Sequence, residues 1–337
     1  MEKNIKVVFS AQNCVELWEE EIPEIGENEV LIETEVSQIS TGTELTRLEG
    51  NVDKDSIWVK GLNYPIYPGY SNVGKIIKVG EEVDKDWLGK RVLTTARHQK
   101  YVACTAGDGL IVVPDGVDSD EAVFGVLGCV AMASIRSAGI RPGDTVVVYG
   151  AGLVGQLVAR LAKIAGALNV FVTDVSDYRL GMLPEDESFY KVNTLKEDIV
   201  EVLGKYGKKE LARIVFETTS VPSLVEKEIE CLQKLGRLVI TSSMKGKSLV
   251  DFEYCSRKGL TIIGAHNYAM HTPVATPYDP WTRNEDTRYF LELLNKKEIS
   301  LKETITHKES YKNAIEMYQM LMKDRTQALC VLLSWKD

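Results

Sequence analysis

The chain has 337 residues, 44% hydrophobic and 26% charged, which is typical of a globular protein with about two domains. Its 40 basic and 49 acidic side chains give a formal net charge of −9, which repels phosphate backbones, so nucleic acid is not expected as a partner. No two of the six cysteines stand closer than 24 positions, which excludes a C-x-x-C zinc motif. Without a signal peptide or an apolar run of 18 residues, we expect a cytoplasmic protein with reduced cysteines and no membrane contact.

The first third of the chain is predicted to consist of short β-strands that are separated by turn residues. Apolar and β-branched runs mark strands at residues 5–9, 30–36, 74–80, 91–95 and 110–114. Short strands at close spacing favour a compact β-barrel or sandwich.

From about residue 120 the pattern changes to alternating helices and strands. A helical stretch leads to residues 145–149, an uninterrupted apolar run of the kind that is buried on both faces of a parallel sheet. The other predicted elements are helices at 122–137, 153–165 and 223–235 and strands at 170–174, 214–217, 236–240 and 260–264. This order predicts an α/β fold with a Rossmann-type doubly wound parallel sheet.

The C-terminal part of the chain is less regular. Three prolines between residues 266 and 284 predict a loop. Helices are predicted at about 286–294 and 311–322. The apolar run at 328–333 is predicted to be a strand that returns to the first domain, so that the α/β domain is an insertion in the β domain.

The glycine-rich segment after the buried strand predicts a dinucleotide site. Residues 150–155 match G-x-G-x-x-G between a strand and a helix, as the binding mechanism requires. Gly150 allows the tight turn, Gly152 lets the backbone approach a pyrophosphate, and Gly155 lets helix and strand pack closely. The start of the helix, at Leu153 and Val154, then offers free N–H groups to the phosphates.

An acidic residue at the end of the next strand completes this motif. Asp174 lies 24 residues after Gly150, where a carboxylate accepts both ribose hydroxyls of NAD and repels a 2′-phosphate. NAD is therefore favoured over NADP, and Arg179 would soften that preference. The alternative is a structural glycine turn with a capping aspartate.

Other cofactor contacts are expected where further strands of the sheet end. Thr241 and Ser242 follow the strand at 236–240 and are candidates to meet the nicotinamide carboxamide. Thr218 follows the strand at 214–217 and is a further candidate.

Three short motifs carry a resemblance to a known family. Residues 68–74 (PGYSNVG) resemble P-G-H-E-x-x-G, residues 41–44 (TGTE) resemble C-G-T-D, and residues 141–144 (RPGD) precede the nucleotide strand. With these motifs the whole chain resembles the medium-chain dehydrogenase/reductase superfamily. The resemblance implies a GroES-like catalytic domain over 1–124 and 266–337, a Rossmann domain over 125–265, and a homodimer or homotetramer.

The chain departs from that family at the positions of the catalytic zinc. Zinc-binding members use a cysteine, a histidine, and a cysteine or glutamate; this chain has Thr41 and Tyr70 at the first two positions, with Ser71 in place of the usual neighbouring glutamate. The third position falls near Gly125 and Val126. Zinc prefers nitrogen, sulfur or carboxylate ligands, so no catalytic zinc is predicted.

The lobe that binds a structural zinc in the family is also missing. Cys104 is the only cysteine between residues 94 and 114, where four would be expected, so no metal site is predicted at all. Residues 39–44 and 64–70 resemble more closely the subgroup that contains bacteriochlorophyllide a dehydrogenase. That subgroup is broad and does not name a substrate.

Without zinc, side chains must hold and move the proton of the substrate hydroxyl. Tyr70 is the first candidate, provided that its pKa of about 10 is lowered; the alternative is that it only fills the empty metal position. Thr43 would relay the proton or stabilise the turn, and Glu44 would orient the site or form a structural ion pair. His98, on a loop, would transfer protons or lie in solvent, and His266 is expected beside the nicotinamide end of the cofactor.

The remaining histidines, His271 and His307, are predicted to be solvated loop residues. The leading hypothesis is an NAD-dependent oxidoreductase that interconverts a secondary alcohol, of the sugar, cyclitol or polyol kind, and its ketone by hydride transfer without catalytic zinc. The alternatives are a zinc-free reductase of activated C=C bonds of the quinone or enoyl type, an NAD-retaining lyase or epimerase, and a protein that binds NAD without turnover.

Overall fold

The computed structural model describes residues 2–107, 109–206 and 211–336, which form two compact units. Unit 1 joins the chain up to Val126 with the chain from Thr287 onward, and unit 2 comprises Leu127–Asp286. The unit that contains both ends of the described chain is therefore interrupted in sequence by the other unit. Two helices, α3 (Gly125–Ala138) and α10 (Arg283–Asn295), run through the two boundaries.

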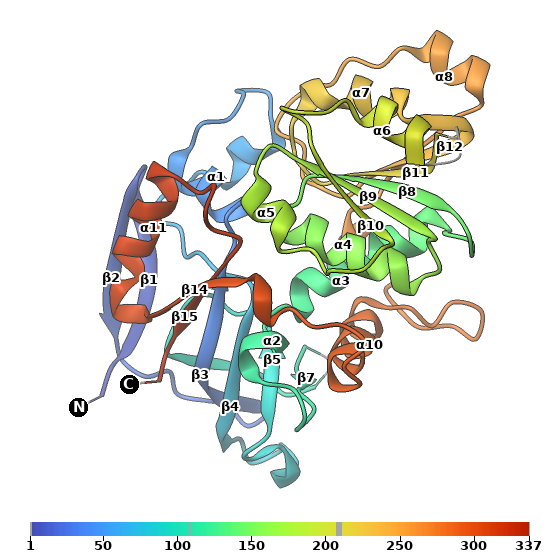
Figure 1. The fold of residues 1–337 in the computed structure, drawn as a ribbon. Helices are drawn as coiled ribbons and strands as arrows, with labels where there is room; N and C mark the ends of the chain where they lie inside the picture. Colours follow the sequence, from blue (N-terminus) through green and yellow to red (C-terminus); the bar gives the residue numbers. More distant parts are fainter. Residues whose placement is uncertain (1, 108, 207–210, 337) are drawn as a thin grey trace. The chain divides into compact units, whose positions relative to one another are not determined.

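A seven-stranded sheet forms the centre of unit 1, with β3 (Glu29–Ile39) as its longest strand (Figure 1). The strand order is β14-β15-β3-β4-β5-β7, and β6 also pairs with β3. The other strands are β4 (Asn72–Val79), β5 (Arg91–Thr94), β6 (Tyr101–Thr105), β7 (Ile111–Val112), β14 (Ile305–Ser310) and β15 (Cys330–Ser334). Because β15 pairs antiparallel with β3, the prediction that the last strand returns to the first domain is confirmed.

A second sheet of unit 1 is a hairpin of β1 (Asn4–Ala11) and β2 (Cys14–Glu20), beside which helix α11 (Ala314–Lys323) packs (Figure 1). Aromatic side chains fill the core between them. Phe9 meets Tyr318 edge to face with ring centroids 5.1 Å apart, and Tyr311 stacks on Trp335 at 4.8 Å. Shorter helices of this unit are α1 (Thr43–Glu49), the 3-10 helix η1 (Ile57–Gly61) and α2 (Ser119–Ala122).

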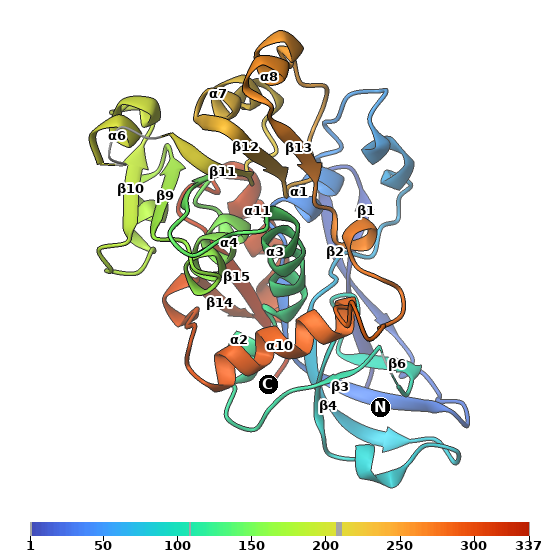
Figure 2. The same ribbon diagram turned by 90° about the vertical axis from the view of Figure 1, so that its right-hand side faces the viewer.

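Unit 2 contains a six-stranded parallel sheet in the order β10-β9-β8-β11-β12-β13, and Figure 2 shows β10 and β13 at its two edges. Its strands are β8 (Thr145–Tyr149), β9 (Asn169–Asp174), β10 (Phe189–Asn193), β11 (Ala212–Glu217), β12 (Leu232–Ile240) and β13 (Thr261–Gly264). The chain order reverses between β8 and β11, which is the point where ligands bind such sheets. The predicted doubly wound α/β fold is confirmed.

The β8 strand shows why this sheet could be predicted. Val147 and Tyr149 pack against a core that α6, α7 and α8 share, whereas Val146 and Val148 on the opposite face are also fully buried. A strand buried on both faces reads as a continuous apolar run. The helices of this unit are α4 (Leu153–Ile164), α5 (Asp177–Gly181), α6 (Ile199–Tyr206), α7 (Val225–Glu230), α8 (Phe252–Lys258) and α9 (Asn267–Met270).

The predicted helix at 223–235 is too long. Helix α7 ends at Glu230, and β12 begins at Leu232, which pairs with Ala212 of β11. Leu235 has φ = 61°, a left-handed conformation that no helix interior adopts. The pairing with β11 is a long-range contact, and it overrides the helical periodicity of this segment.

The second domain boundary also differs from the expected one. The structure places it after Asp286 rather than after residue 265. The predicted loop is held to unit 2 because His271 contacts Asp286, which Arg136 of α3 binds, and because the Arg136 guanidinium lies 3.4 Å from the centre of the Trp281 ring.

All six cysteines are unpaired. Within the described ranges, every helix is too short or too polar to span a lipid bilayer.

Glu228, on α7, is an ionisable residue in an environment that disfavours the charged form of its side chain. Its side chain is fully buried, and neither carboxyl oxygen has a hydrogen-bond partner among the residues that the structure describes. Burial, and secondarily the nearby Glu217, raise its pKa from 4.5 to about 9. Glu228 is therefore a neutral acid in the folded protein at pH 7.

This raised pKa predicts a specific dependence of stability on pH. Between about pH 4.5 and 9 the folded state holds a proton on Glu228 that the unfolded state loses, so stability falls as the pH rises through this window. Glu228→Gln should remove this loss of stability. The free energy of unfolding of the variant, relative to that of the wild type, should therefore increase with pH by at most about 1.4 kcal/mol per pH unit. Denaturant unfolding of the wild type and of Glu228→Gln at pH 5, 7 and 8.5 measures this pH dependence.

The exposed Glu226 on the same helix provides the control. Glu226→Gln should follow the wild type at each pH. A Glu228→Gln variant whose stability difference from the wild type is the same at all three pH values would contradict the assignment.

Candidate active site

The glycine turn of unit 2 brings the start of α4 close to the end of β8. Gly150 has φ = 99°, a conformation that favours glycine. A Cβ atom on Gly155 would lie only 1.8 Å from the carbonyl oxygen of Gly150, so no side chain fits there. Gly155 therefore permits the close packing of helix and strand that the sequence predicted.

The start of α4 is open in the way that a phosphate group needs. A Cβ atom on Gly152 would meet nothing within 4 Å, and no side chain caps the helix. The N–H groups of the first helical residues, Leu153 and Val154 among them, point out of the helix start without an intrahelical acceptor. This end of a 12-residue helix suits a pyrophosphate.

Two side chains hold the glycine turn from either side. Asp174 at the end of β9 accepts hydrogen bonds from the N–H groups of Ala151 at 2.8 Å and Ser176 at 2.9 Å, one on each carboxylate oxygen. The hydroxyl of Thr218, after β11, donates to the carbonyl oxygen of Tyr149 at 2.6 Å. Each Asp174 oxygen keeps a lone pair for a ribose hydroxyl, whereas Thr218 serves the turn itself.

Arg179, predicted to contact the cofactor, and His266, predicted as a catalytic residue, follow other strands of the same sheet. Arg179 on α5 is half-buried, and its backbone carbonyl accepts a hydrogen bond from the side chain of Gln156 on α4 at 2.8 Å. His266 follows β13 at the same edge of the sheet and is exposed. Most of the candidate cofactor residues thus lie at the carboxyl ends of β8, β9, β11 and β12.

Glu217 is a site residue that the sequence reasoning missed. It ends β11, is fully buried, and accepts hydrogen bonds from the N–H groups of Thr219 at 2.6 Å and Ser220 at 2.7 Å. Its second oxygen accepts the hydroxyl of Ser242, so Ser242 orders the loop after β12. The hydroxyl of Thr241 is buried with no partner within the described part of the chain, which leaves it available to a ligand. An acidic residue ending a buried strand, the signal that identified Asp174, would have found Glu217.

In unit 1, hydroxyl groups gather at the position of the family's metal ligands. Tyr70 is half-buried and donates to Ser40 Oγ at 2.8 Å. Ser40 Oγ also accepts the backbone N–H of Thr43 at 3.3 Å, and the Thr43 side chain hydrogen-bonds Tyr70, so Tyr70, Ser40 and Thr43 form one hydroxyl cluster. Burial, and secondarily the Glu44 charge, raise the pKa of Tyr70 to about 12 despite its hydrogen bond to Ser40. The lowered pKa expected for a tyrosine base is not found, and Tyr70 is a neutral donor at pH 7.

Glu44 and His98 lie beneath this cluster rather than on the surface. His98 is fully buried, so the alternative that it is a solvated loop residue is wrong. Its Nε2 lies 3.1 Å from a carboxylate oxygen of Glu44, and its Nδ1 lies 2.7 Å from Ser37 Oγ. Tyr318 also donates to Glu44, which is 2% exposed. Glu44 thus lies among buried partners, of which His98 forms an ion pair with it only when the imidazole is protonated.

These contacts change what Glu44 and His98 can do. Trp335 Nε1 donates to Ser37 Oγ at 2.8 Å, so the Ser37 hydroxyl proton is left to bond His98 Nδ1, and His98 Nε2 is the nitrogen that faces Glu44. With every polar atom engaged in the interior, neither side chain offers a surface to a substrate. Any effect they have on the reaction passes through Ser37, Ser40 or Tyr318.

The residues at the family's zinc positions do not fit a zinc ion. Thr41, Tyr70 and Ser71 offer hydroxyl oxygens, and the Ser71 hydroxyl is engaged with the backbone carbonyl of Val123. Across residues 2–107, 109–206 and 211–336, no three His, Cys, Asp or Glu side chains are placed to hold a metal. Zinc needs such ligands in a tetrahedral array.

His271 is the second histidine whose predicted place is wrong. Its side chain is 3% exposed, and its Nε2 lies 2.8 Å from an oxygen of Asp286. Arg136 binds the other Asp286 oxygen at 2.6 Å. The buried carboxylate of Asp286 thus links His271 to Arg136 of α3.

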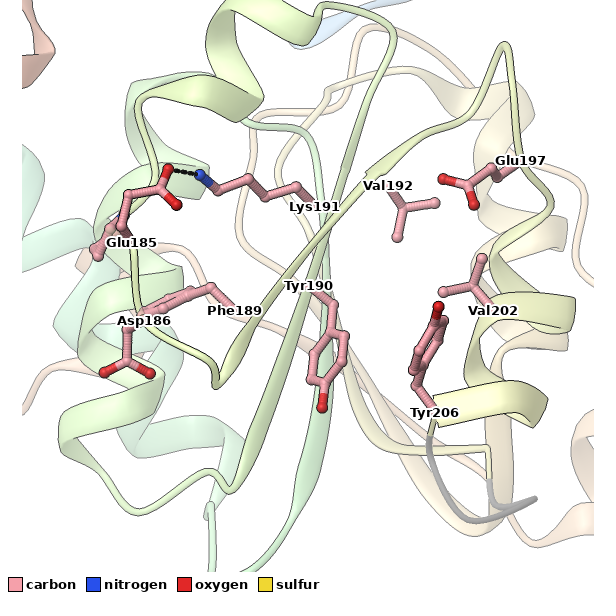
Figure 3. Close-up of a pocket in the computed structure, with 10 residues that line it drawn as sticks. Glu185, Asp186, Phe189, Tyr190, Lys191, Val192, Glu197, Val202 and Tyr206 are labelled. Carbon is pink, nitrogen blue, oxygen red and sulfur yellow. Dashed lines mark hydrogen bonds and ion pairs between the residues drawn. The ribbon is translucent and has the colours of Figure 1, made fainter.

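A separate hollow of 420 Å³ lies on unit 2 between β10 and α6 (Figure 3). Tyr190 and Tyr206 line it with ring centroids 5.7 Å apart, and Lys191 pairs with Glu185 at its rim. Its strand residues precede the carboxyl end of β10, whereas the glycine turn follows the carboxyl end of β8. The hollow is therefore distinct from the candidate cofactor site.

Comparison with known proteins gives matches to both units. The family model described as "Alcohol dehydrogenase GroES-like domain" matches residues 26–140, and that described as "Zinc-binding dehydrogenase" matches residues 154–278. The chain is 25% identical over 365 residues to the L-threonine 3-dehydrogenase of Anaeromyxobacter sp. (strain K). This match covers 98% of the chain and 99% of the relative.

Solved structures match the same fold. A structure described as a short chain alcohol dehydrogenase of Escherichia coli CFT073 with the cofactor NADH has a TM-score of 0.83 at 19% identity, over 99% of this chain and 100% of that one. The 2R,3R-butanediol dehydrogenase from Bacillus subtilis has a TM-score of 0.82 at 20% identity, again over 99% and 100%. At these identities the likeness concerns the fold.

The two glycines of the turn give a matched pair of predictions. Gly155→Ala places a Cβ atom 1.8 Å from a backbone oxygen, so the thermal midpoint of unfolding should fall by several degrees. Gly152→Ala enters open space and should leave the midpoint unchanged, yet it should weaken NADH binding at least about tenfold because the methyl group occupies the approach to the helix start. Differential scanning fluorimetry and NADH titration measure both.

The pair separates a structural turn from a cofactor site. If Gly152→Ala bound NADH as tightly as the wild type, the turn would be structural and the pyrophosphate assignment would fail.

Proposed function

Because the chain belongs to the medium-chain dehydrogenase/reductase superfamily, we propose that it is an NAD-dependent oxidoreductase that interconverts a secondary alcohol and its ketone without catalytic zinc. The substrate proposed is a sugar, a cyclitol or a related polyol. The observation that carries the proposal is the hydroxyl cluster of Tyr70, Ser40 and Thr43 at the position where zinc-binding relatives hold their metal.

Unit 2 supplies the residues for the cofactor. The open start of α4 would bind the pyrophosphate, and Asp174 would accept the ribose hydroxyls and repel a 2′-phosphate. The unpartnered hydroxyl of Thr241 would serve the nicotinamide end. When bound, the nicotinamide ring supplies the hydride acceptor for alcohol oxidation and the hydride donor for ketone reduction.

Unit 1 supplies the residue for the substrate oxygen. With a pKa of about 12, Tyr70 stays protonated and donates a hydrogen bond to the oxygen that gains negative charge during hydride transfer. Ser40 Oγ accepts a hydrogen bond from Tyr70 in the free protein. When the Tyr70 hydroxyl turns to the substrate, the Ser40 hydroxyl can donate its own proton to the Tyr70 oxygen. The hydroxyl groups of Ser40 and Thr43 would then relay the substrate proton from Tyr70 to solvent water, which takes it up.

Two alternatives remain distinct from this proposal. A reductase of activated C=C bonds usually takes NADPH, which the carboxylate of Asp174 disfavours. A lyase or epimerase would keep its NAD bound and regenerate it in each turnover, so no NADH would accumulate. A screen of NAD reduction over sugars, cyclitols and other secondary alcohols separates these, since only the dehydrogenase accumulates NADH.

Tyr70→Phe tests the proposed donor. It keeps the ring and removes the hydroxyl, so kcat should fall about 100-fold while the KM for NAD stays unchanged. The exposed Tyr67, whose ring packs near Trp18, gives the control, and Tyr67→Phe should keep full activity. Steady-state kinetics with the best alcohol of the screen measures both variants. If the kcat of Tyr70→Phe stayed within twofold of the wild-type value, Tyr70 would only fill the space of the metal position and would not be the donor.

A further inference from the structure

Two buried hydrogen-bond donors of unit 1 have no acceptor among the described residues. They are Nε of Arg47, on α1, and Nε1 of Trp58, on η1. Buried donors are almost always paired in folded proteins, and a buried tryptophan N–H usually finds a partner. Two orphan donors on neighbouring segments therefore point to a missing acceptor.

The two donors lie on the same side of η1. A Cβ atom on Gly61 would stand 3.7 Å from Nε and 3.9 Å from Nη2 of Arg47, so the guanidinium packs against the end of this 3-10 helix. Trp58 and Gly61 are three residues apart, and side chains at this spacing eclipse in a 3-10 helix. The Trp58 side chain thus projects from the edge of η1 that Arg47 faces.

The charge of Arg47 is also unmatched. Although Glu44 and Glu49 share its helix, no carboxylate in the described part of the chain lies within ion-pair distance of its guanidinium, and Glu44 is engaged with His98. Arg136 differs, because its Nε and Nη2 both donate hydrogen bonds to the carboxylate of Asp286. A half-buried guanidinium always carries its charge, and its fork matches a carboxylate or a phosphate.

Arg47 stands one helical turn from the proposed reaction centre. Thr43 and Arg47 are i and i+4 on α1 and share a face, about 6 Å apart along the axis. Thr43 belongs to the hydroxyl cluster with Tyr70, and the Arg47 charge acts on Tyr70 by lowering its pKa. A small molecule whose hydroxyl meets Tyr70 would therefore place a substituent a few atoms away at Arg47.

We propose that Arg47 and Trp58 form an anion-binding subsite, and that the alcohol substrate carries a carboxylate or phosphate group which this subsite holds. The proposal rests on the proposed function in that Tyr70 binds the reacting oxygen. It assigns specificity for charged over neutral polyols to Arg47, with the indole N–H of Trp58 as a second donor.

Kinetics on matched substrates tests this assignment. Neutral polyols, their phosphate monoesters and the corresponding sugar acids form the panel, and an anionic member should be oxidised with the higher kcat/KM. Arg47→Gln should raise the KM for that substrate about 10- to 100-fold, with kcat and the KM for NAD little changed, because a charged hydrogen bond is lost from binding. Arg47→Lys should recover part of the loss, and Trp58→Phe should give a smaller increase.

Lys60, exposed on η1, supplies the matched control. Lys60→Gln removes one positive charge from the same segment and should leave the KM of every substrate unchanged. If Arg47→Gln left the KM of all anionic substrates unchanged, or raised it equally for neutral ones, the subsite would be overturned.

Equilibrium binding separates this outcome from a failure of the proposed function. Inorganic phosphate and malonate are titrated into the wild type, Arg47→Gln and Lys60→Gln, with calorimetry as the readout and the thermal midpoint as the check on folding. Arg47-dependent binding of either ion, in a protein that oxidises no alcohol, would keep the subsite and reject the dehydrogenase. Binding of neither ion, in a protein that oxidises neutral alcohols, would keep the dehydrogenase and reject the subsite. The ion that binds more tightly tells phosphate from carboxylate.

Discussion

The carboxylate of Glu44 is the interaction on which the proposed substrate half of this protein depends. It is buried, and it accepts hydrogen bonds from the Ser40 N–H at 3.0 Å, from His98 and from Tyr318. A buried charge is costly unless such partners surround it, and removing one partner leaves the others unsatisfied. Because Ser40 also holds the Tyr70 hydroxyl, the position of Tyr70 depends on this carboxylate.

The groups that hold Glu44 come from distant parts of the chain. His98 precedes β6, Tyr318 lies on α11, and Trp335 follows β15 and reaches His98 through Ser37. The return of the C-terminal segment to unit 1 therefore does more than close the sheet, since it completes the support of the hydroxyl cluster. Unit 2 uses the same device, with the buried Glu217 ordering the loops after β11 and β12.

The parts of the fold that could be predicted are those whose signals are local. The glycine turn, the buried strand at 145–149 and the acid at Asp174 occupy fixed spacings, and the structure places them together. The fold class and the interrupted β domain followed from the order of strands and helices. The end of α7 did not, because the pairing of Leu232 with Ala212 is a long-range contact.

The burial of His98 and Glu44 could not be predicted from the sequence. His98 and Glu44 are 54 positions apart and Glu44 and Tyr318 are 274 apart, so no local pattern shows that they meet in the interior. The raised pKa of Tyr70 depends on that burial, and it changes the proposed role from base to neutral donor. The unmatched charge of Arg47 is likewise a property of the folded chain, since the sequence places two glutamates on its own helix.

The central claim is that this member of the superfamily performs its hydride transfer with hydroxyl groups where relatives use zinc. Elemental analysis of protein purified from zinc-supplemented cells tests it most directly, with alcohol-dependent NAD reduction measured on the same sample before and after treatment with a zinc chelator. The account predicts less than about 0.1 zinc ion per chain and the same turnover after the chelator, since Thr41, Tyr70 and Ser71 do not form a zinc site. One zinc ion per chain, with activity that disappears on chelation and returns with added zinc, would contradict it.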